Sequence, residues 1–503
     1  MTRFDNLLRP QAQVGDKDAE SALRVALLAR QRVLQTSKRS VIVIIAGING
    51  GGTGQVIRSL SEWLDPRYVR SYTFSKRSEE ERERPPFWRY WMSLPARGNI
   101  ATYTDAWYTE AIRKYAKYKI TKRVFSRMLG HIQQFESDLV SDGTIILKYW
   151  LHLESDEQKA RFDKLLGNPE TAWRVSKEDL KSTKYYSTYT TAAARAIEET
   201  DSSIAPWQVM SGVDPESCAW FIGRDIEKRV GQNLDGNAAL DEPKINEPNV
   251  DEANVNEGRK DVAGSKYRNM FAHVDLQQEL SKSKYKKRLA RYQARLADLH
   301  QRAKKKDVST IVVFEGWDAA GKGGAIRRIT YALDPRQYRV IRIAAPTDEE
   351  LARHYLWRFW RHIPRAGNTT IYDRSWYGRV LVERVEGFAQ KPRWQQAYDE
   401  INDFEQALVE HGSLMIKFWL HISPDEQLRR FKQREQIPHK HHKITEEDYR
   451  NREKWDDYCA AANEMIARTD TSWAPWQIIA ANDKRSARVK VLEQLCDAYE
   501  QLL

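Results

Sequence analysis

Short apolar runs, mostly rich in β-branched residues, recur along the chain. The clearest cover residues 41–45, 311–314, 369–372, 414–422 and 478–481, and residues 339–343 form a further strand candidate. Runs of this length are typical of buried strands. Between them lie helical patterns over residues 285–300, 325–333, 351–362 and 487–499, and the third of these follows a capping pair formed by Thr347 and Glu350. The pattern therefore predicts buried strands separated by helices.

The chain repeats itself at a constant offset of 269 positions, the distance from Gly47 to Gly316. Matching segments at this offset include 64–66 and 333–335, 88–91 and 357–360, 148–152 and 417–421, and 205–208 and 474–477. This period is far longer than that of a solenoid repeat. We therefore expect a duplicated domain, with a first copy at 1–231, a polar linker at 232–264 and a second copy at 265–503.

A glycine-rich turn follows the strand at 311–314. The spacing from Gly316 to Gly321 and Lys322 matches a phosphate-binding loop up to its last position, where Gly323 replaces the usual serine or threonine. Because that hydroxyl is a Mg²⁺ ligand, the metal needs another one, and Asp318 is the nearest candidate. We expect phosphate contacts from Gly316, Ala319, Ala320, Gly321, Gly323 and Gly324.

An acidic and a basic residue directly follow the strand expected at 369–372. Asp373 stands at its carboxyl end, where open α/β sheets bind ligands, and is the expected Mg²⁺ anchor. Arg374 beside it can clamp a phosphoryl group. The first copy has Thr104 and Asp105 at these positions.

The loop of the first copy has lost its charged groups as well. Asn49 stands in place of Asp318, and Thr53 in place of Lys322. We therefore expect the chemistry to lie in the second copy.

A basic helix begins after Ser423-Pro424 and leads into a basic segment. Such a run is usually a solvated face, but here it follows a strand that should end near the phosphate loop, so we interpret it as a lid over phosphates. In the first copy, Leu165 replaces Arg434 and Thr171 replaces Lys440. The histidines at 439, 441 and 442 resemble a metal site only superficially, since no carboxylate lies at ligand spacing.

Three residues are candidates for nucleotide contacts. The aromatic residues of 351–362 are typical of a core, but Trp357 can also stack on a nucleobase. Arg379 closes the motif that begins at Tyr372, and Asn482 lies in the turn after the last strand. We expect Trp357, Arg379 and Asn482 to contact the nucleotide.

Composition narrows the class of protein. The net charge of +12 indicates an anionic partner, which can be nucleic acid, anionic lipid or a phosphate polymer. The three cysteines are scattered, the longest apolar run is too short to span a bilayer, and the first residues lack the apolar segment of a signal peptide. These observations favour a cytoplasmic protein. The sequence does not decide whether the chain forms a homo-oligomer.

Together these motifs resemble the family-2 polyphosphate kinases. The resemblance rests on residues 316–324, 372–377, 430–435 and 474–476, and it covers the second copy throughout and the first in degraded form. A fused pair with one decayed copy is similar to the subgroup that acts as polyphosphate:AMP phosphotransferase. One departure is His442, which occupies a lid position where the family commonly carries tryptophan, whereas the first copy keeps Trp173.

The resemblance implies an α/β fold of tandem phosphate-loop kinase domains, each a three-layer α/β/α sandwich with a parallel sheet and a helical lid. It implies transfer of the terminal phosphoryl group of inorganic polyphosphate to AMP, giving ADP. Asp373 would hold Mg²⁺ (or Mn²⁺), Asp318 would share the metal or orient the acceptor phosphate, and Lys322 and Arg374 would stabilise the transferring group. The polyphosphate chain would be held by Arg430, Arg434, Lys440 and Lys443.

A polyphosphate ligand also explains the net positive charge of the chain, so neither nucleic acid nor a membrane is needed as a partner. Three alternatives stay open from the sequence: a polyphosphate kinase for nucleoside diphosphates, an ATP-dependent nucleotide kinase, and a non-catalytic polyphosphate-binding protein. The basic lid argues against the second, and the loop lysine with both aspartates argues against the third.

Overall fold

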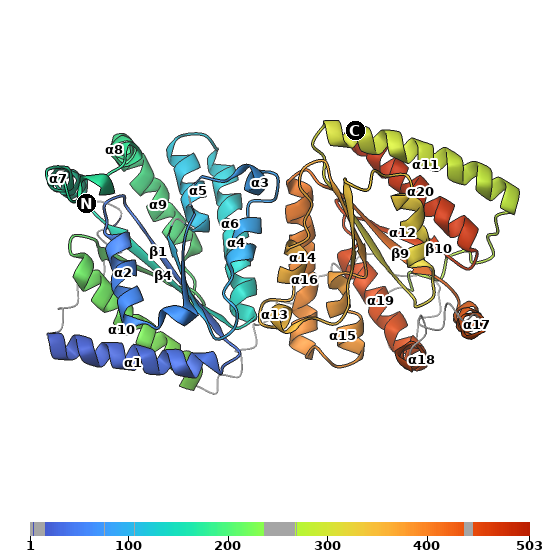
Figure 1. Cartoon of the computed structure of the whole chain (residues 1–503), viewed down its shortest axis with the longest axis horizontal. Coiled ribbons are helices and arrows are strands. Elements are labelled where there is room, and N and C mark those ends of the chain that lie inside the picture. Colours follow the sequence, from blue (N-terminus) through green and yellow to red (C-terminus); the bar gives the residue numbers. More distant parts are fainter. Residues whose placement is uncertain are drawn as a thin grey trace, which may run out of the picture. The chain divides into compact units, whose positions relative to one another are not determined.

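The computed structural model describes residues 4, 16–74, 76–104, 106–235, 267, 269–436 and 446–503. It divides into two compact units, one formed by Met1–Arg77, Arg89–Ile245 and Thr347–His354, and the other by Ser78–Trp88, Asn246–Pro346 and Tyr355–Leu503. Each unit contains one parallel five-stranded sheet with helices packed on it (Figure 1). The expected α/β fold is confirmed.

The first sheet has the strand order β2-β3-β1-β4-β5, and all of its strand pairs are parallel. Its strands are β1 (Ser40–Gly47), β2 (Val69–Thr73), β3 (Ile100–Thr104), β4 (Thr144–His152) and β5 (Trp207–Ser211). In chain order up to residue 235 the helices are α1 (Lys17–Gln35), α2 (Thr53–Trp63), α3 (Glu79–Arg82), α4 (Trp88–Ser93), α5 (Trp107–Ala116), α6 (Lys122–Ser141), α7 (Ser155–Leu166), α8 (Lys177–Ser182), α9 (Tyr186–Thr200) and α10 (Pro215–Asp235), of which α3 belongs to the second unit.

The second sheet has the order β10-β9-β6-β8-β7, which is the same topology with the first strand of the copy again in the centre. Its strands are β6 (Thr310–Gly316), β7 (Tyr338–Arg342), β8 (Thr369–Asp373), β9 (Leu414–His421) and β10 (Trp476–Ala480). In chain order from residue 282 the helices are α11 (Lys282–Lys305), α12 (Lys322–Thr330), α13 (Asp348–Leu351), α14 (Trp357–Trp360), α15 (Val382–Val385), α16 (Lys391–Glu410), α17 (Pro424–Glu435), α18 (Glu446–Glu453), α19 (Trp455–Thr469) and α20 (Lys484–Leu502), of which α13 belongs to the first unit.

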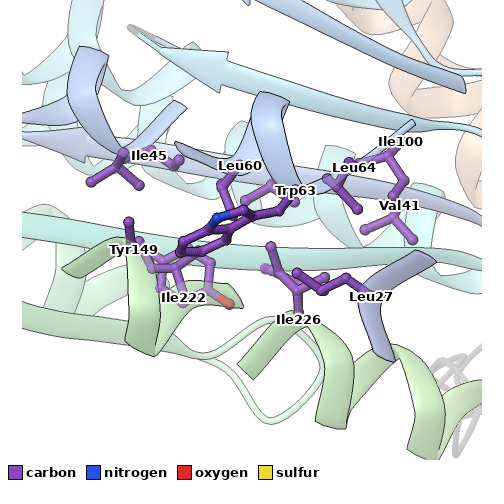
Figure 2. Close-up of a cluster of buried hydrophobic side chains, with 14 of the residues drawn as sticks. Leu27, Val41, Ile45, Leu60, Trp63, Leu64, Ile100, Tyr149, Ile222 and Ile226 are labelled. Carbon is purple, nitrogen blue, oxygen red and sulfur yellow. The ribbon is translucent and has the colours of Figure 1, made fainter. Parts of the chain in front are cut away.

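The core follows from the alternation of side chains along each central strand. In the first sheet Val41, Val43 and Ile45 point to one face and pack with apolar residues of α1, α2 and α10, including Trp63 and Ile222 (Figure 2). Both faces of β1 are buried, since every residue from 40 to 46 is buried. This explains the near-continuous apolar runs that the sequence shows.

Each unit contains its own copy of the same buried polar network. In the second unit the Lys417 ammonium donates hydrogen bonds to the Glu405 carboxylate at 2.7 Å and to the Tyr377 hydroxyl at 2.9 Å. In the first unit Lys148 makes the same bonds, at 2.8 Å to Glu136 and at 3.0 Å to the equivalent tyrosine hydroxyl. A fully buried ion pair repeated in this way supports the interpretation as a duplicated domain.

Two local expectations are wrong. The helix expected over 351–362 is divided into α13 and α14, although its capping box at Thr347 and Glu350 is present. The intervening His354 and Leu356 are buried, so tertiary packing outweighs the local helical preference. The expected linker begins too early, because α10 continues to Asp235, and the rest of 232–264 lies outside the described residues.

Candidate functional site

The centre of the candidate site is the loop between β6 and α12. Gly316 has a φ of 130°, and a Cβ there would lie 2.4 Å from the carbonyl oxygen of Leu420, so only glycine fits. Gly321 has a φ of 110° and is the N-cap of α12. A Cβ at Gly321 or Gly323 would meet no atom of the described chain within 4 Å. The loop therefore has glycine where the backbone requires it and has open space beside the helix N-terminus, where an anion binds favourably.

Lys322 is the first residue of α12 and bends back over this loop. Its ammonium donates hydrogen bonds to the carbonyl oxygens of Gly316 at 2.6 Å and Trp317 at 3.4 Å. The full positive charge is thus held at the loop, beside the N–H groups that begin the helix. This is the arrangement that the loop motif predicts for binding phosphate.

Asp318 lies inside the loop and pairs with Arg374. The Arg374 guanidinium donates to one Asp318 carboxylate oxygen at 2.9 Å, and the Asn451 amide of α18 donates to the other at 3.2 Å. Burial alone would raise the pKa of Asp318, but the charges of Lys322 and Arg374 outweigh it and hold the pKa below its usual value. Asp318 is therefore a carboxylate at neutral pH. Arg374 itself adopts a φ of 64°, which is rare for a side chain of this size.

Asp373 is the last residue of β8 and pairs in register with Phe314 of β6, two residues before Gly316. Asp373 thus lies at the carboxyl end of β8, and Asp318 lies two residues beyond the carboxyl end of the neighbouring parallel strand β6. Carboxylate oxygens suit Mg²⁺ or Mn²⁺, and such ions often take only one or two protein carboxylates and complete their shell with phosphate oxygens and water. The described residues contain no cluster of three or more His, Cys, Asp or Glu side chains that could hold an ion alone. The two aspartates fit a metal that is shared with a bound phosphate.

Arg430 has a different position from the one expected for a polyphosphate ligand. Its side chain is buried, and its two terminal nitrogens donate to the carbonyl oxygens of Ala319, Ala320, Ala481 and Asn482 at 2.6 to 2.9 Å. Arg161, its equivalent in the first copy, makes the same kind of contacts to the carbonyl oxygens of Gly50 and Gly212. An arginine used in this way in both copies supports the backbone of the loop, and the carbonyl groups occupy the guanidinium nitrogens that a polyphosphate chain would need.

Of the other expected lid residues, only Arg434 lies in the part of the chain that the structure describes. Arg434 is half-buried near the end of α17, while Lys440 and Lys443 lie outside the described residues. Their contact with polyphosphate stays a prediction. Residues 439, 441 and 442 also lie outside the described residues.

The three expected nucleotide contacts are already engaged in other interactions. Trp357 is 5% exposed, so its ring is not open to a nucleobase in this conformation. The Asn482 side chain accepts the backbone N–H of Ser423 at 3.0 Å and thereby holds the start of α17. Arg379 pairs with Glu383 at 2.9 Å and lies 4.4 Å from the ring centre of Tyr355. Of the three, only Arg379 presents a partly exposed charged group, and its contact with a nucleotide stays a prediction.

The sequence interpretation missed Glu315 and Ser375. Both are buried, and the Ser375 hydroxyl donates to the Glu315 carboxylate at 2.8 Å. Burial raises the pKa of Glu315, an effect that the nearby charge of Lys322 partly offsets. The sequence did contain a signal for this pair. Glu315 is the one charged residue of its strand, and the first copy has alanine at both equivalent positions, Ala46 and Ala106.

The first copy has an equivalent glycine loop before α2, but other residues fill the space beside it. Gly52 caps α2 with a φ of 90°, but a Cβ there would lie 2.5 Å from the ring of Pro215. The Asn49 amide donates to the Asp179 carboxylate of α8 at 2.9 Å, which places an acid beside the loop. The space that is open in the second copy is therefore filled or negatively charged in the first.

Comparisons with known proteins show the family to which the chain is similar. The family model described as polyphosphate kinase 2 (PPK2) matches residues 12–219 and 279–502. The chain is 43% identical to a polyphosphate:AMP phosphotransferase of Pseudomonas aeruginosa over 97% of this chain and 98% of the relative, and 36% identical to one of Acinetobacter johnsonii over 95% of both. A crystal structure of a polyphosphate kinase 2 from Pseudomonas aeruginosa PA01 matches with a TM-score of 0.85 and 41% identity over 99% of each chain.

Proposed function

Because the chain belongs to the polyphosphate kinase 2 family, we propose that it transfers the terminal phosphoryl group of inorganic polyphosphate to AMP, giving ADP. The relatives that match nearly its whole length carry the name of this activity. One structural observation carries the proposal: the second copy has an open phosphate loop with Lys322, flanked by Asp318, Asp373 and Arg374. The first copy lacks all four groups.

In this reaction an oxygen of the AMP phosphate attacks the terminal phosphorus of polyphosphate. The bond between that phosphorus and the next bridging oxygen breaks, so the polymer leaves shorter by one phosphate and ADP forms. The protein contributes position and charge rather than covalent chemistry. Lys322 and the loop N–H groups hold the transferring group, and Arg374, released from Asp318, neutralises charge on it.

Asp373 and Asp318 would hold the divalent cation, Mg²⁺ or Mn²⁺. When bound, that ion neutralises charge on the phosphate oxygens of donor and acceptor. In the structure Asp318 is paired with Arg374 and Asn451, so binding of metal and phosphate requires these partners to rearrange. The ion pair between Asp318 and Arg374 would then open. Asp318 would contact the metal ion instead, and Arg374 would contact the phosphoryl group.

We propose that the protein acts in the cytoplasm, a reducing compartment that contains AMP. All three cysteines are free thiols in the structure. In the described part of the chain, no helix is long and apolar enough to cross a membrane. We propose no nucleic-acid partner, because the phosphate polymer accounts for the basic excess.

The test is incubation of the purified full chain with AMP, Mg²⁺ and polyphosphate, followed by nucleotide chromatography. The proposal expects ADP to appear with polyphosphate as donor and much more slowly with ATP. ADP formed only with ATP would identify an ATP-dependent kinase instead. Turnover restricted to nucleoside diphosphates would identify the other acceptor class, and absence of any product would leave only a binding protein.

A further inference from the structure

The first turn of α20 lies directly beside the phosphate loop. Arg430 links the two, since one of its terminal nitrogens donates to the loop carbonyls of Ala319 and Ala320 and the other to those of Ala481 and Asn482. Helix α20 begins two residues after Asn482, at Lys484. Residues in the first turns of this helix are therefore fixed relative to the loop.

Two basic side chains of α20 face this region. Lys484 and Arg488 are one helical turn apart and so share a face of the helix. An Arg488 guanidinium nitrogen lies 3.1 Å from the place where a Cβ on Gly324 would be, in the first turn of α12. Arg488 therefore contacts the helix whose N-terminus forms part of the phosphate loop.

Within the described residues, neither basic side chain forms an ion pair, although the Glu426 carboxylate lies near enough to Lys484 to offset part of the surrounding positive charge. Among the described residues, no carboxylate lies within salt-bridge distance of Lys484 or Arg488, whereas Lys490 of the same helix pairs with Glu493 at 2.8 Å. Both are half-buried. Burial and then the charge of Arg430 lower the pKa of Lys484 to about 8, and Arg434 adds to the effect. Lys484 thus lies near the positive charges of Arg430, Arg429 and Arg434, which the Glu426 carboxylate partly offsets.

The first copy has lost this basic face together with the loop charges. Pro215 stands in place of Lys484, Ala219 in place of Arg488 and Leu165 in place of Arg434. Pro215 also closes the space beside Gly52 that the equivalent Gly321 leaves open. Three basic side chains that served only solubility would have no reason to be lost from the copy that has also lost the charged groups of its phosphate loop.

We propose that Lys484 and Arg488 form a phosphate-binding subsite on α20, near Arg434 of α17, which extends the loop into a track for the polyphosphate donor. This inference rests on the proposed function for its ligand. A phosphate polymer suits the site because it presents a charge at every unit, so cations beyond the loop each gain a partner. AMP carries a single phosphate, so it gains little from cations that lie beyond the loop.

The test measures binding of end-labelled inorganic polyphosphate to the full chain by fluorescence anisotropy, without AMP, for Lys484→Ala, Arg488→Ala and the double variant. Lys490→Ala is the matched control, since it removes the same charge from the same helix. We expect each single change to weaken binding several-fold and the double change to weaken it by at least about tenfold, while the control stays within about twofold. Lys484→Arg should keep wild-type affinity.

A salt series and kinetics distinguish a track from a merely structural role. Loss of two phosphate contacts should make polyphosphate binding less steeply dependent on salt, by the counterion-release argument that holds for other polyanions. The KM for polyphosphate should rise with that for AMP unchanged. Wild-type affinity and salt dependence in the double variant would overturn the proposal. If the wild-type chain binds polyphosphate through these residues but forms no ADP, the subsite stands and the proposed function fails.

Discussion

The Ser375 hydroxyl donates a 2.8 Å hydrogen bond to the Glu315 carboxylate, and this bond joins the two segments that carry the site. Glu315 directly precedes the phosphate loop, and Ser375 directly follows Asp373 and Arg374. Because Arg374 has a left-handed φ of 64°, its turn needs external support. The hydrogen bond between Ser375 and Glu315, which are both buried, supplies this support.

Ser375→Ala should therefore lower kcat by about tenfold or more, because small misplacements of charged groups are costly in phosphoryl transfer. The KM values for AMP and polyphosphate should change less, since the loop and its lysine remain. Ser413→Ala is the matched control: Ser413 forms an equally buried hydroxyl pair with Ser309 at 2.9 Å, at the start of β9 and away from the loop. Equal kinetic losses in the two variants would show a general effect of removing a buried hydroxyl.

Arg430→Ala should destabilise the second unit by about 3 kcal/mol, because it leaves several buried carbonyl groups without a donor and creates a cavity. Arg161→Ala should destabilise the first unit in the same direction. Chemical denaturation measures both. Arg429→Ala is the control, since Arg429 is exposed and its ion pair with Glu426 should contribute at most about 1 kcal/mol. An unchanged unfolding midpoint with a raised KM for polyphosphate would return Arg430 to the polymer-binding role that the sequence suggests.

The pKa of about 8 at Lys484 predicts a pH dependence of donor use. Below pH 8 the ammonium is charged and attracts phosphate, and above it the charge is lost. For the wild type, kcat/KM for polyphosphate should fall as the pH rises from 7 to 9. Lys484→Arg should flatten this part of the profile, because arginine stays protonated throughout. Identical profiles for the two proteins would argue against a role of Lys484 in donor binding.

Asp373→Asn should retain the fold but lose metal-dependent turnover, because it removes a charged oxygen ligand at nearly constant volume. A readout independent of activity is Mn²⁺ binding in the presence of polyphosphate, followed by electron paramagnetic resonance. The variant should bind Mn²⁺ more weakly than wild type. Full activity of the variant, or of wild type in excess chelator, would refute the metal assignment.

The sequence was sufficient for the strands, the phosphate loop and the duplication, because each leaves a local or periodic signature. Apolar runs gave the strands, and Gly316, Gly321 and Lys322 gave the loop at the right place. The roles of long side chains were not predictable in this way. Arg430 appears as one more cation of a basic helix, and only its burial against four carbonyl groups distinguishes it from Arg434.

Residues far apart in sequence account for most of what was missed. Glu315 and Ser375 are separated by 60 positions, and Lys484 lies far from the loop in sequence. A comparison of the two copies at the constant offset would have singled out all three, since Ala46, Ala106 and Pro215 replace them. The division of the expected helix at 351–362 had no such signal, because burial of His354 and Leu356 depends on the whole fold.

The central claim, that polyphosphate phosphorylates AMP in the second copy alone, is tested most directly by comparing Lys322→Ala with Thr53→Ala. These variants change equivalent positions of the two loops. Initial rates of ADP formation from AMP and polyphosphate should fall by at least about 10²-fold for Lys322→Ala, as for loss of a preorganised charge, and stay near the wild-type rate for Thr53→Ala. Equal losses in both variants, or an unaffected Lys322→Ala, would contradict the account.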